Sequence, residues 1–411
     1  MIRKHRILKM STFFMLLFVF VFSCKKDGDE TNNTYLVSKN LYVSYSESLV
    51  NSVLDAASIY FPGVPDLKQY VETGTSLYRI VYNTTIKGKQ TRVSGVVCVP
   101  TDAGEYPVLS FQNGTNTLNR NAPSQFPDDK GFQLLHVIAS MGYVVVISDY
   151  PGFGESNDIP HPYLVKEPTV QSLVDMLYAV KEMDAELPVI TIKNEHYVMG
   201  YSQGGWATLQ LHRALENDYK NDFNLKGSVC GAGPYNIYAL LQEMFQASEF
   251  PMPYYIGYVL NAYKEYDQFT NPITDILNEP YASRIGSLYT GQLTSGEINS
   301  QLTTNMPDLI TADFLSGFST SPKYALVREA MVSNSVAPWK TNVPLLLFHG
   351  DADTHVLPSA TEDIYNAMIA AGTTEDTIDK IILPGLDHSE GIIPSLVQGF
   401  IFINNIRNSN R

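Results

Sequence analysis

HYVMGYSQGGWATLQL, residues 196–211, is the stretch that decides the fold. Its first four residues predict a short strand, and the apolar positions from Trp206 onward predict a helix. Between them, Gly200, Ser202 and Gly204 form the pattern G-x-S-x-G. A sharp strand–turn–helix elbow of this kind presents the serine hydroxyl at the edge of a sheet, and only glycine fits the crowded positions beside it. Ser202 is therefore the candidate nucleophile.

A serine hydroxyl is a poor nucleophile near neutral pH and needs a base, usually histidine. In folds with this elbow the base comes last along the chain, which leaves His349, His355 and His388. His388 lies in the loop PGLDHSEG, residues 384–391, after a predicted strand over 377–383. Because a base must be presented from such a loop, we select His388.

The base needs a carboxylate that orients its ring. Asp353 follows a predicted strand over 343–348 and is the candidate acid. Asp351 is its rival, but it lies closer to the strand end and is the better turn-former. Asp387 adjoins His388 and is badly placed to reach the second ring nitrogen, so a turn role is favoured for it.

A serine that attacks a carbonyl also needs N–H donors for the developing oxyanion. One donor is expected at Gln203, directly after the nucleophile. The second is expected from the loop after a predicted strand over 108–111. Thr115 is the choice there, with Gly114 or Asn116 as alternatives, although the loop could be an ordinary Asn-Gly turn.

Short apolar strands alternate with helices on both sides of the elbow. Further strands are expected at 143–148 and 227–230, and helices at 132–141, 170–183, 203–216, 360–371 and 392–404. A hairpin over 77–99, turning at Lys87-Gly88-Lys89, precedes them. The alternation predicts an α/β fold with a mostly parallel central sheet and helices on both faces.

The alternation stops in residues 234–338, which we interpret as a helical cap insertion between core segments 76–233 and 339–411. Residues 35–75 are expected to be an N-terminal helical segment, with a helix over Glu47–Tyr60. Seven large apolar side chains of the insertion would either line a pocket or pack its helices together: Met244, Phe245, Phe250, Met252, Tyr254, Tyr255 and Tyr258.

The amino terminus has the pattern of an export signal. A basic stretch precedes the apolar run 13–22, which is too short to span a bilayer comfortably, so residues 1–23 are predicted to be a signal peptide rather than an anchor helix. The run ends at Ser23-Cys24, which resembles a bacterial lipobox, and the charged residues 25–30 resemble lipoproteins of the Bacteroidota. This resemblance implies a lipid on Cys24, a tether over 24–34, and a protein held to the bacterial outer membrane on its periplasmic or cell-surface side.

Composition excludes several classes of partner. The 411 residues contain 28 Lys and Arg against 42 Asp and Glu, a net charge of −14. No basic cluster follows the first ten residues, so nucleic acid is not expected as a partner. Cys98 and Cys230 are either free buried thiols, which we favour, or one disulfide. No C-x-x-C or H-E-x-x-H occurs, so neither a metal nor a cofactor is expected.

Five pieces of the chain, in order, resemble the α/β-hydrolase superfamily: Asn113-Gly114, the run DYPGFGES at 149–156, the Ser202 elbow, Gly350 to Val356, and the His388 loop. Asn113 and Pro151 stand where the superfamily often has His and Arg; these departures still allow the backbone roles but obscure the subfamily. Within it the chain resembles secreted lipases and esterases, and its insertion resembles the cap of fungal secretory lipases. The resemblance implies cleavage of a small-molecule, lipid or glycan ester through an acyl-enzyme on Ser202.

Three other functions stay open. A serine aminopeptidase of the same fold would need acidic cap residues for a substrate amine, and four are available: Glu243, Glu249, Glu265 and Asp267. An esterase that removes acyl groups from polysaccharides would suit a surface lipoprotein. A non-catalytic binding protein on this scaffold is disfavoured by the intact Ser202, Asp353 and His388. Fold alone does not choose among substrates.

Overall fold

The computed structural model describes residues 33–61, 63–126 and 130–409. The predicted signal peptide over 1–23, the lipidation site Cys24 and almost all of the tether over 24–34 lie outside the described residues.

Nine strands form one sheet in the order β1-β2-β3-β5-β4-β6-β7-β8-β9. They are β1 (Leu36–Tyr45), β2 (Thr75–Ile86), β3 (Lys89–Pro100), β4 (Gly104–Gln112), β5 (Val144–Ser148), β6 (Ile190–Tyr201), β7 (Leu225–Gly231), β8 (Leu345–Gly350) and β9 (Ile378–Leu383). The pairings from β5 through β9 are parallel, and those among β1, β2, β3 and β5 are antiparallel. The prediction of a mostly parallel α/β sheet is therefore confirmed.

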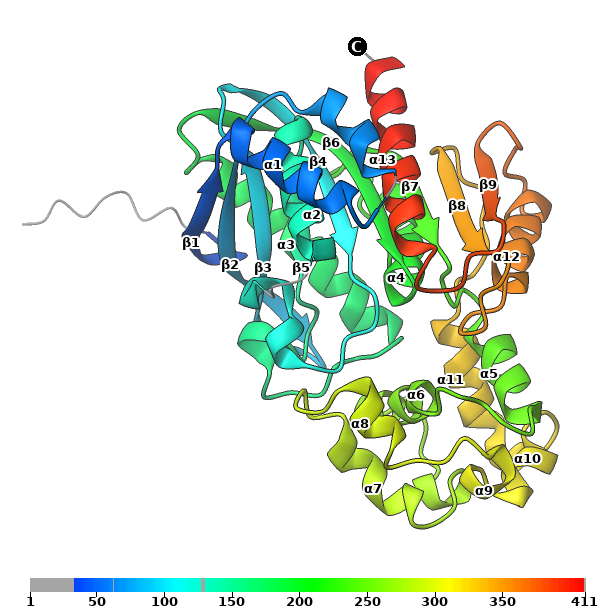
Figure 1. Ribbon diagram of the computed structural model, residues 1–411. Helices are drawn as coiled ribbons and strands as arrows, with labels where there is room; N and C mark the ends of the chain where they lie inside the picture. Colours follow the sequence, from blue (N-terminus) through cyan, green and yellow to red (C-terminus); the bar gives the residue numbers. More distant parts are fainter. Residues whose placement is uncertain (1–32, 62, 127–129, 410–411) are drawn as a thin grey trace, which may run out of the picture. The chain divides into compact units, whose positions relative to one another are not determined.

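Helices cover both faces of the sheet, because its central strand β5 is apolar on both of its faces. Val144 and Val146 of β5 pack into one hydrophobic cluster, whereas Val145 and Ile147 pack into the other. Successive side chains of a strand point to opposite faces, so such a run needs cover on both sides. One face carries α1 (Glu47–Ser58), α2 (Lys130–Ile138) and α13 (Ile392–Ser409), and the other carries α3 (Lys166–Asp184), α4 (Gln203–Asn217) and α12 (Ser359–Ala370) (Figure 1).

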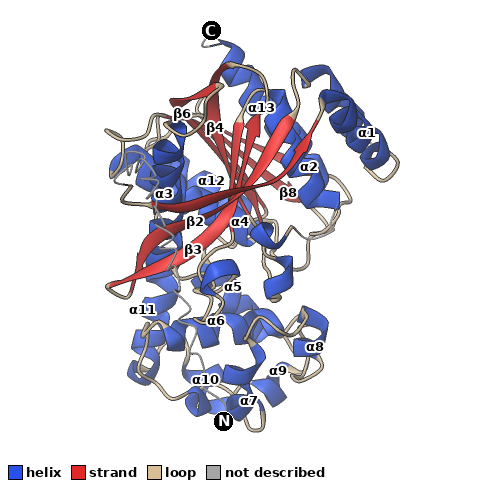
Figure 2. Cartoon of the chain, turned by 90° about the vertical axis from the view of Figure 1, so that its left-hand side faces the viewer, coloured by secondary structure: helices blue, strands red, loops and turns tan. Residues whose placement is uncertain are grey.

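Between β7 and β8 the described chain contains helices and no strand beyond two isolated bridges. These helices are α5 (Ile237–Gln246), α6 (Tyr254–Glu265), α7 (Tyr281–Leu288), α8 (Ser295–Asn299), α9 (Met306–Leu309), α10 (Ala312–Gly317) and α11 (Ala325–Asn334). Figures 1 and 2 show them gathered beyond one end of the sheet. We call Ile237–Asn334 the helical segment.

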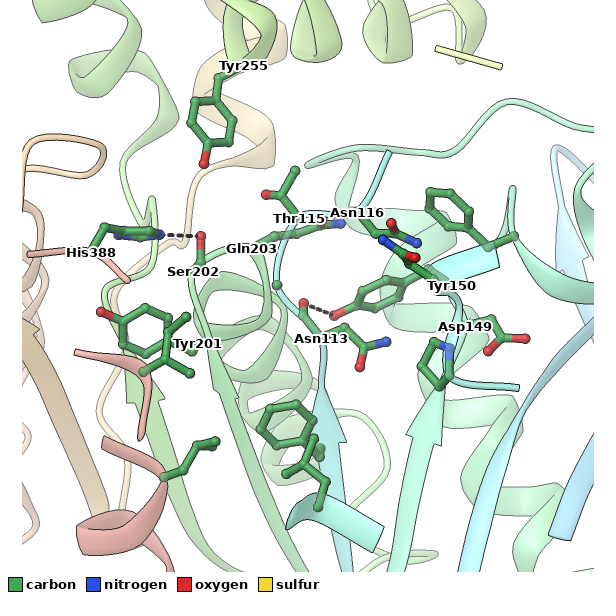
Figure 3. A pocket seen from close by; sticks show the side chains of 18 residues that line it. Asn113, Thr115, Asn116, Asp149, Tyr150, Tyr201, Ser202, Gln203, Tyr255 and His388 are labelled. Carbon is green, nitrogen blue, oxygen red and sulfur yellow. Dashed lines mark hydrogen bonds between the residues drawn. The ribbon is translucent and has the colours of Figure 1, made fainter. Parts of the chain in front are cut away.

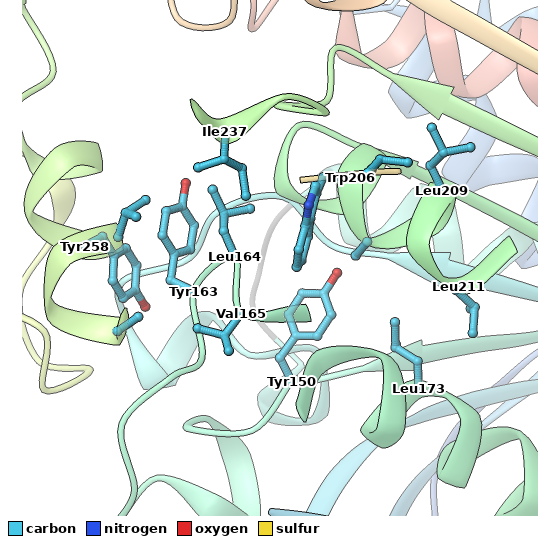
Figure 4. Close-up of a cluster of buried hydrophobic side chains, with 14 of the residues drawn as sticks. Tyr150, Tyr163, Leu164, Val165, Leu173, Trp206, Leu209, Leu211, Ile237 and Tyr258 are labelled. Atoms are coloured by element: carbon cyan, nitrogen blue, oxygen red, sulfur yellow. The ribbon is translucent and has the colours of Figure 1, made fainter. Parts of the chain in front are cut away.

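Buried side chains continue from the core into the helical segment. Trp206 of α4 is fully buried and its indole N–H donates to the Asn334 carbonyl at 2.9 Å. Tyr163, from a core loop, stacks on Tyr258 of α6 with ring centroids 4.2 Å apart (Figure 4). The helical segment therefore packs on the core through one shared apolar cluster.

The prediction that residues 35–75 form a helical segment is wrong for their first part. Residues 35–75 do contain a helix, α1, but they begin with β1, which pairs with β2 as an edge strand. This strand escaped prediction because it is exposed on much of both faces, with Leu41 58% and Tyr42 60% exposed, so it lacks an alternating pattern. Glu182 of α3 holds its start by accepting hydrogen bonds from the backbone N–H groups of residues 34–36.

Cys98 and Cys230 are both free and fully buried, which agrees with the favoured expectation. Burial raises the pKa of each thiol well above its usual value, so both behave as small apolar side chains. Among the described residues, no helix is both long enough and apolar enough to cross a membrane.

Candidate active site

Ser202 lies on the predicted elbow between β6 and α4. Its backbone has φ 61° and ψ −125°, a conformation that L-residues rarely adopt, and its N–H donates to the Gly231 carbonyl at 2.9 Å. A Cβ on Gly200 would lie 2.5 Å from the Gly204 carbonyl oxygen, and one on Gly204 would overlap the Gln112 carbonyl. Glycine at both positions is thus a steric requirement of the turn.

The structure brings the three predicted chemical groups together. The His388 Nε2 atom lies 2.9 Å from the Ser202 hydroxyl oxygen (Figure 3), and its Nδ1 atom lies 2.6 Å from Asp353 Oδ2. The residues come from loops that follow β6, β8 and β9, and Ser202 is 9% exposed, whereas His388 is 7% and Asp353 2% exposed. This arrangement can transfer a proton from the serine to the histidine while the carboxylate holds the ring.

The surroundings of Asp353 keep its carboxylate ionised. Burial by itself would raise its pKa, but hydrogen bonds from His349 and His388 and the charge interaction with His388 hold the pKa well below the usual range. Its other oxygen accepts the backbone N–H groups of His355 at 2.8 Å and Val356 at 3.0 Å. The carboxylate is therefore fixed in place as well as charged at neutral pH.

The two rival carboxylates act as turn residues. Asp351 accepts the backbone N–H of Gly385 at 2.6 Å, joining the two loops that carry Asp353 and His388. Asp387 is exposed and accepts the N–H groups of Ser389 and Glu390, each at 2.9 Å. Neither has a hydrogen bond to His388 among the described residues.

The loop after β4 is braced from two directions. From the core, Tyr150 donates its hydroxyl to the Asn113 carbonyl at 3.1 Å, and the Asn113 amide donates to the Ser148 carbonyl at 2.6 Å. From the helical segment, Tyr258 donates to the Asn116 carbonyl at 3.0 Å. Thr115 and Gln203 both line the cavity in front of Ser202 (Figure 3). The two candidate oxyanion donors thus border the same cavity as Ser202.

His161 and Gln203 form a buried hydrogen-bonded pair on the other side of the elbow, which the sequence did not predict. His161 Nδ1 donates to the Pro151 carbonyl at 2.8 Å, so its Nε2 accepts from the Gln203 side-chain amide at 2.9 Å. Burial lowers the pKa of His161 to about 4, which keeps the ring neutral. Nothing local in the sequence indicated this contact, because 42 residues separate its partners.

His355 and Tyr201 flank the His388 ring. The ring of His355 lies 5.0 Å from that of His388, and Tyr201 lies 5.3 Å away on centroid distances. Burial and the neighbouring His388 lower the pKa of His355. By its place in the sequence His355 is another candidate base, but its Nδ1 has no hydrogen-bond partner among the described residues. It is a wall of the site rather than the residue that faces Ser202.

Two cavities of very different size meet at Ser202. The wide one, of about 400 Å³, reaches His388 and the loop after β4, and the narrow one, of about 30 Å³, runs between Ser202 and α5. Tyr255 borders both. Of the seven large apolar residues expected to line a pocket or pack helices, Met244 and Tyr255 line these cavities, and the other five pack in or against the shared cluster.

Acidic residues of the helical segment do not reach this site. The four that a peptidase could use, Glu243, Glu249, Glu265 and Asp267, are all exposed and line neither of the two cavities. The described residues contain no group of three or more His, Cys, Asp or Glu side chains arranged to hold a metal ion.

Many solved structures share this fold, and three of them are compared with this chain. A protein from Legionella pneumophila is 24% identical over 90% of this chain and 98% of its own, with a TM-score of 0.80. The rice cell wall degrading esterase LipA from Xanthomonas oryzae is 21% identical over 92% and 98%, with a TM-score of 0.76. Candida antarctica lipase A is 16% identical over 92% and 83%, with a TM-score of 0.64. At these identities the likeness establishes the α/β-hydrolase fold.

Comparison with curated proteins finds no match. The family comparison is decisive, since residues 131–388, more than half of the chain, match the secretory lipases. The matched stretch includes Ser202, Asp353 and His388. The chain therefore belongs to the secretory lipase family and is an enzyme that hydrolyses esters.

Proposed function

We propose that the enzyme cleaves carboxylic esters through an acyl-enzyme on Ser202. His388 takes the proton of the hydroxyl as the Ser202 oxygen bonds to the ester carbonyl carbon. The carbonyl–alkoxy bond then breaks, and His388 returns the proton to the leaving alcohol. Water, deprotonated by the same histidine, then releases the acid and frees the serine. The observation that carries the proposal is the 2.9 Å contact of His388 with Ser202, combined with the 2.6 Å contact of His388 with Asp353.

The remaining groups stabilise charge in this scheme. Asp353 holds His388 by Nδ1 and stabilises the imidazolium that forms after proton transfer. The backbone N–H groups of Gln203 and Thr115 receive the oxyanion. The bracing of the Thr115 loop by Tyr150 and Tyr258 supports this role, because an oxyanion donor must be held in position before the charge develops.

The test compares the protein with its Ser202→Ala variant on p-nitrophenyl esters and on aminoacyl p-nitroanilides. We expect the parent to turn over esters and the variant to lose about 10⁴-fold or more of kcat while keeping its circular dichroism spectrum. Preferential turnover of anilides would favour a peptidase. No turnover, together with no labelling by a fluorophosphonate, would favour a non-catalytic binding protein.

We further propose that the enzyme is exported and held by a lipid on Cys24, with residues 24–34 as a tether. The signal-like residues 1–23 and the Ser23-Cys24 junction support this, and a secretory family agrees with export. The Cys24→Ser variant should leave the membrane fraction of the producing cells. Retention of the variant in that fraction would refute lipid anchoring at this residue.

A further inference from the structure

Ser202 stands at the junction of the two cavities, and the difference between them is large. One water molecule needs a cavity of about 10–15 Å³. The narrow cavity, at about 30 Å³, is therefore only about two to three times the space that one water needs. The wide cavity is more than ten times larger, at about 400 Å³. An ester bound at Ser202 must place its acyl chain on one side and its alcohol on the other.

The position of His388 indicates which side takes the alcohol. In the proposed mechanism, on which this inference rests, His388 must reach the leaving oxygen to protonate it. His388 borders the wide cavity and is absent from the walls described for the narrow one. The leaving alcohol therefore lies in the wide cavity, and the acyl chain points into the narrow one.

The narrow cavity has the chemistry of an acyl site. Its walls on the side of the helical segment are the Tyr255 ring and five aliphatic or thioether side chains: Ile237, Leu240, Leu241, Met244 and Val259. Met244 is 6% and Leu241 2% exposed, and both belong to the large cluster that joins the helical segment to the core. Such walls favour a short hydrocarbon chain, and because they are tightly packed they cannot easily move aside for a longer one.

The wide cavity suits a bulkier and more polar group. Phe111, Leu135 and Leu396 form an apolar floor, while Asn113, Asn116 and Asn121 contribute amide groups. Mixed walls of this kind accommodate an alcohol with both apolar surface and hydrogen-bonding groups.

We propose that this secretory lipase acts on short-acyl esters of bulky alcohols, with an acyl limit between acetyl and butyryl set by α5 and α6. Long-chain lipid esters are then poor substrates, because a chain beyond butyryl has no space on the acyl side of Ser202.

The experiment measures kcat/KM on p-nitrophenyl esters from acetyl to dodecanoyl with one constant alcohol. Two variants alter the narrow cavity: Met244→Ala enlarges it, and Leu240→Phe fills it. Leu315→Ala is the matched control, since Leu315 is a partly buried leucine of the same helical segment that lines neither cavity. Thermal unfolding of each variant shows whether the fold is kept.

The parent should favour acetyl to butyryl esters and lose at least about tenfold of kcat/KM by octanoyl, since one methylene misplaced in an apolar pocket already costs about tenfold. Met244→Ala should raise the octanoyl-to-acetyl ratio about tenfold, Leu240→Phe should lower the butyryl-to-acetyl ratio by a similar factor, and Leu315→Ala should change neither.

A parent that prefers octanoyl or longer esters would overturn the acyl limit. Unchanged acyl ratios in both cavity variants would overturn the assignment of the narrow cavity to the acyl chain. In either case the esters are still turned over and the proposed function stands. No ester turnover at all would instead refute the proposed function.

Discussion

The sheet edge and the helical segment contribute to the site in different ways. Ser202, Asp353 and His388 follow three parallel strands, β6, β8 and β9, so the topology of the sheet brings them to one edge. The helical segment supplies no member of that group. It supplies Met244 and Tyr255 as walls, and Tyr258 as a brace for the loop after β4. The comparison teaches that the sheet positions the candidate chemical groups, whereas the helical segment supplies walls and a brace around them.

The largest expected effect is on the sheet side, at Asp353. The Asp353→Asn variant should lose about 10⁴-fold of kcat, because an amide cannot hold the same tautomer of His388 or stabilise its imidazolium. Asp351→Asn is the matched control, since the Asp351 side chain hydrogen-bonds only the Gly385 backbone among described partners. It should stay within about twofold of the parent. Equal losses in the two variants would mean that the acid has been misassigned.

A smaller effect is expected where the helical segment touches the machinery. Tyr258→Phe removes the hydrogen bond to the Asn116 carbonyl and keeps the ring stacked between Tyr163 and Tyr289. We expect kcat to fall about fivefold with KM little changed, since one buried hydrogen bond is worth about 1 kcal/mol.

Tyr324→Phe provides the comparison for that variant. Tyr324 is a buried tyrosine of the helical segment whose hydroxyl donates to Asp313, away from Ser202. It should leave kcat unchanged. A loss confined to KM in Tyr258→Phe would contradict a positioning role and indicate a substrate contact instead.

The last effect is on stability in acid rather than on turnover, and it should arise in the core, since residues 237–334 contain no histidine. Burial lowers the pKa of His136 and His161 to about 4 in the folded protein. As pH falls from 6.5 to about 4, the unfolded chain takes up protons that the folded one refuses. The free energy of unfolding therefore falls in that window, by up to about 1.4 kcal/mol per pH unit for each histidine.

Urea unfolding between pH 7 and pH 4.5 measures this slope. His161→Gln and His136→Gln should each reduce this slope by the equivalent of about one bound proton, whatever they do to the free energy of unfolding at pH 7. A slope that both variants leave unchanged would place the acid-sensitive groups elsewhere in the molecule.

The sequence allowed the fold class and the positions of the candidate chemical groups to be predicted, because glycine spacing and strand ends are local signals. The roles of Ser202, Asp353 and His388 remain predictions, although the structure places them within hydrogen-bond distance. The edge strand β1 and the pair His161–Gln203 were missed. An exposed strand has no alternating pattern, and contacts between distant residues depend on packing that no local pattern records.

The backbone of Ser202 has a consequence for how the protein can change. A residue other than glycine in such a conformation costs about 1–3 kcal/mol. Glycine at position 202 would relieve that strain. Selection for stability alone would therefore favour replacing Ser202, the proposed nucleophile, with glycine. The serine is expected to persist only while the reaction itself is under selection, which makes the elbow a trade-off between durability and turnover.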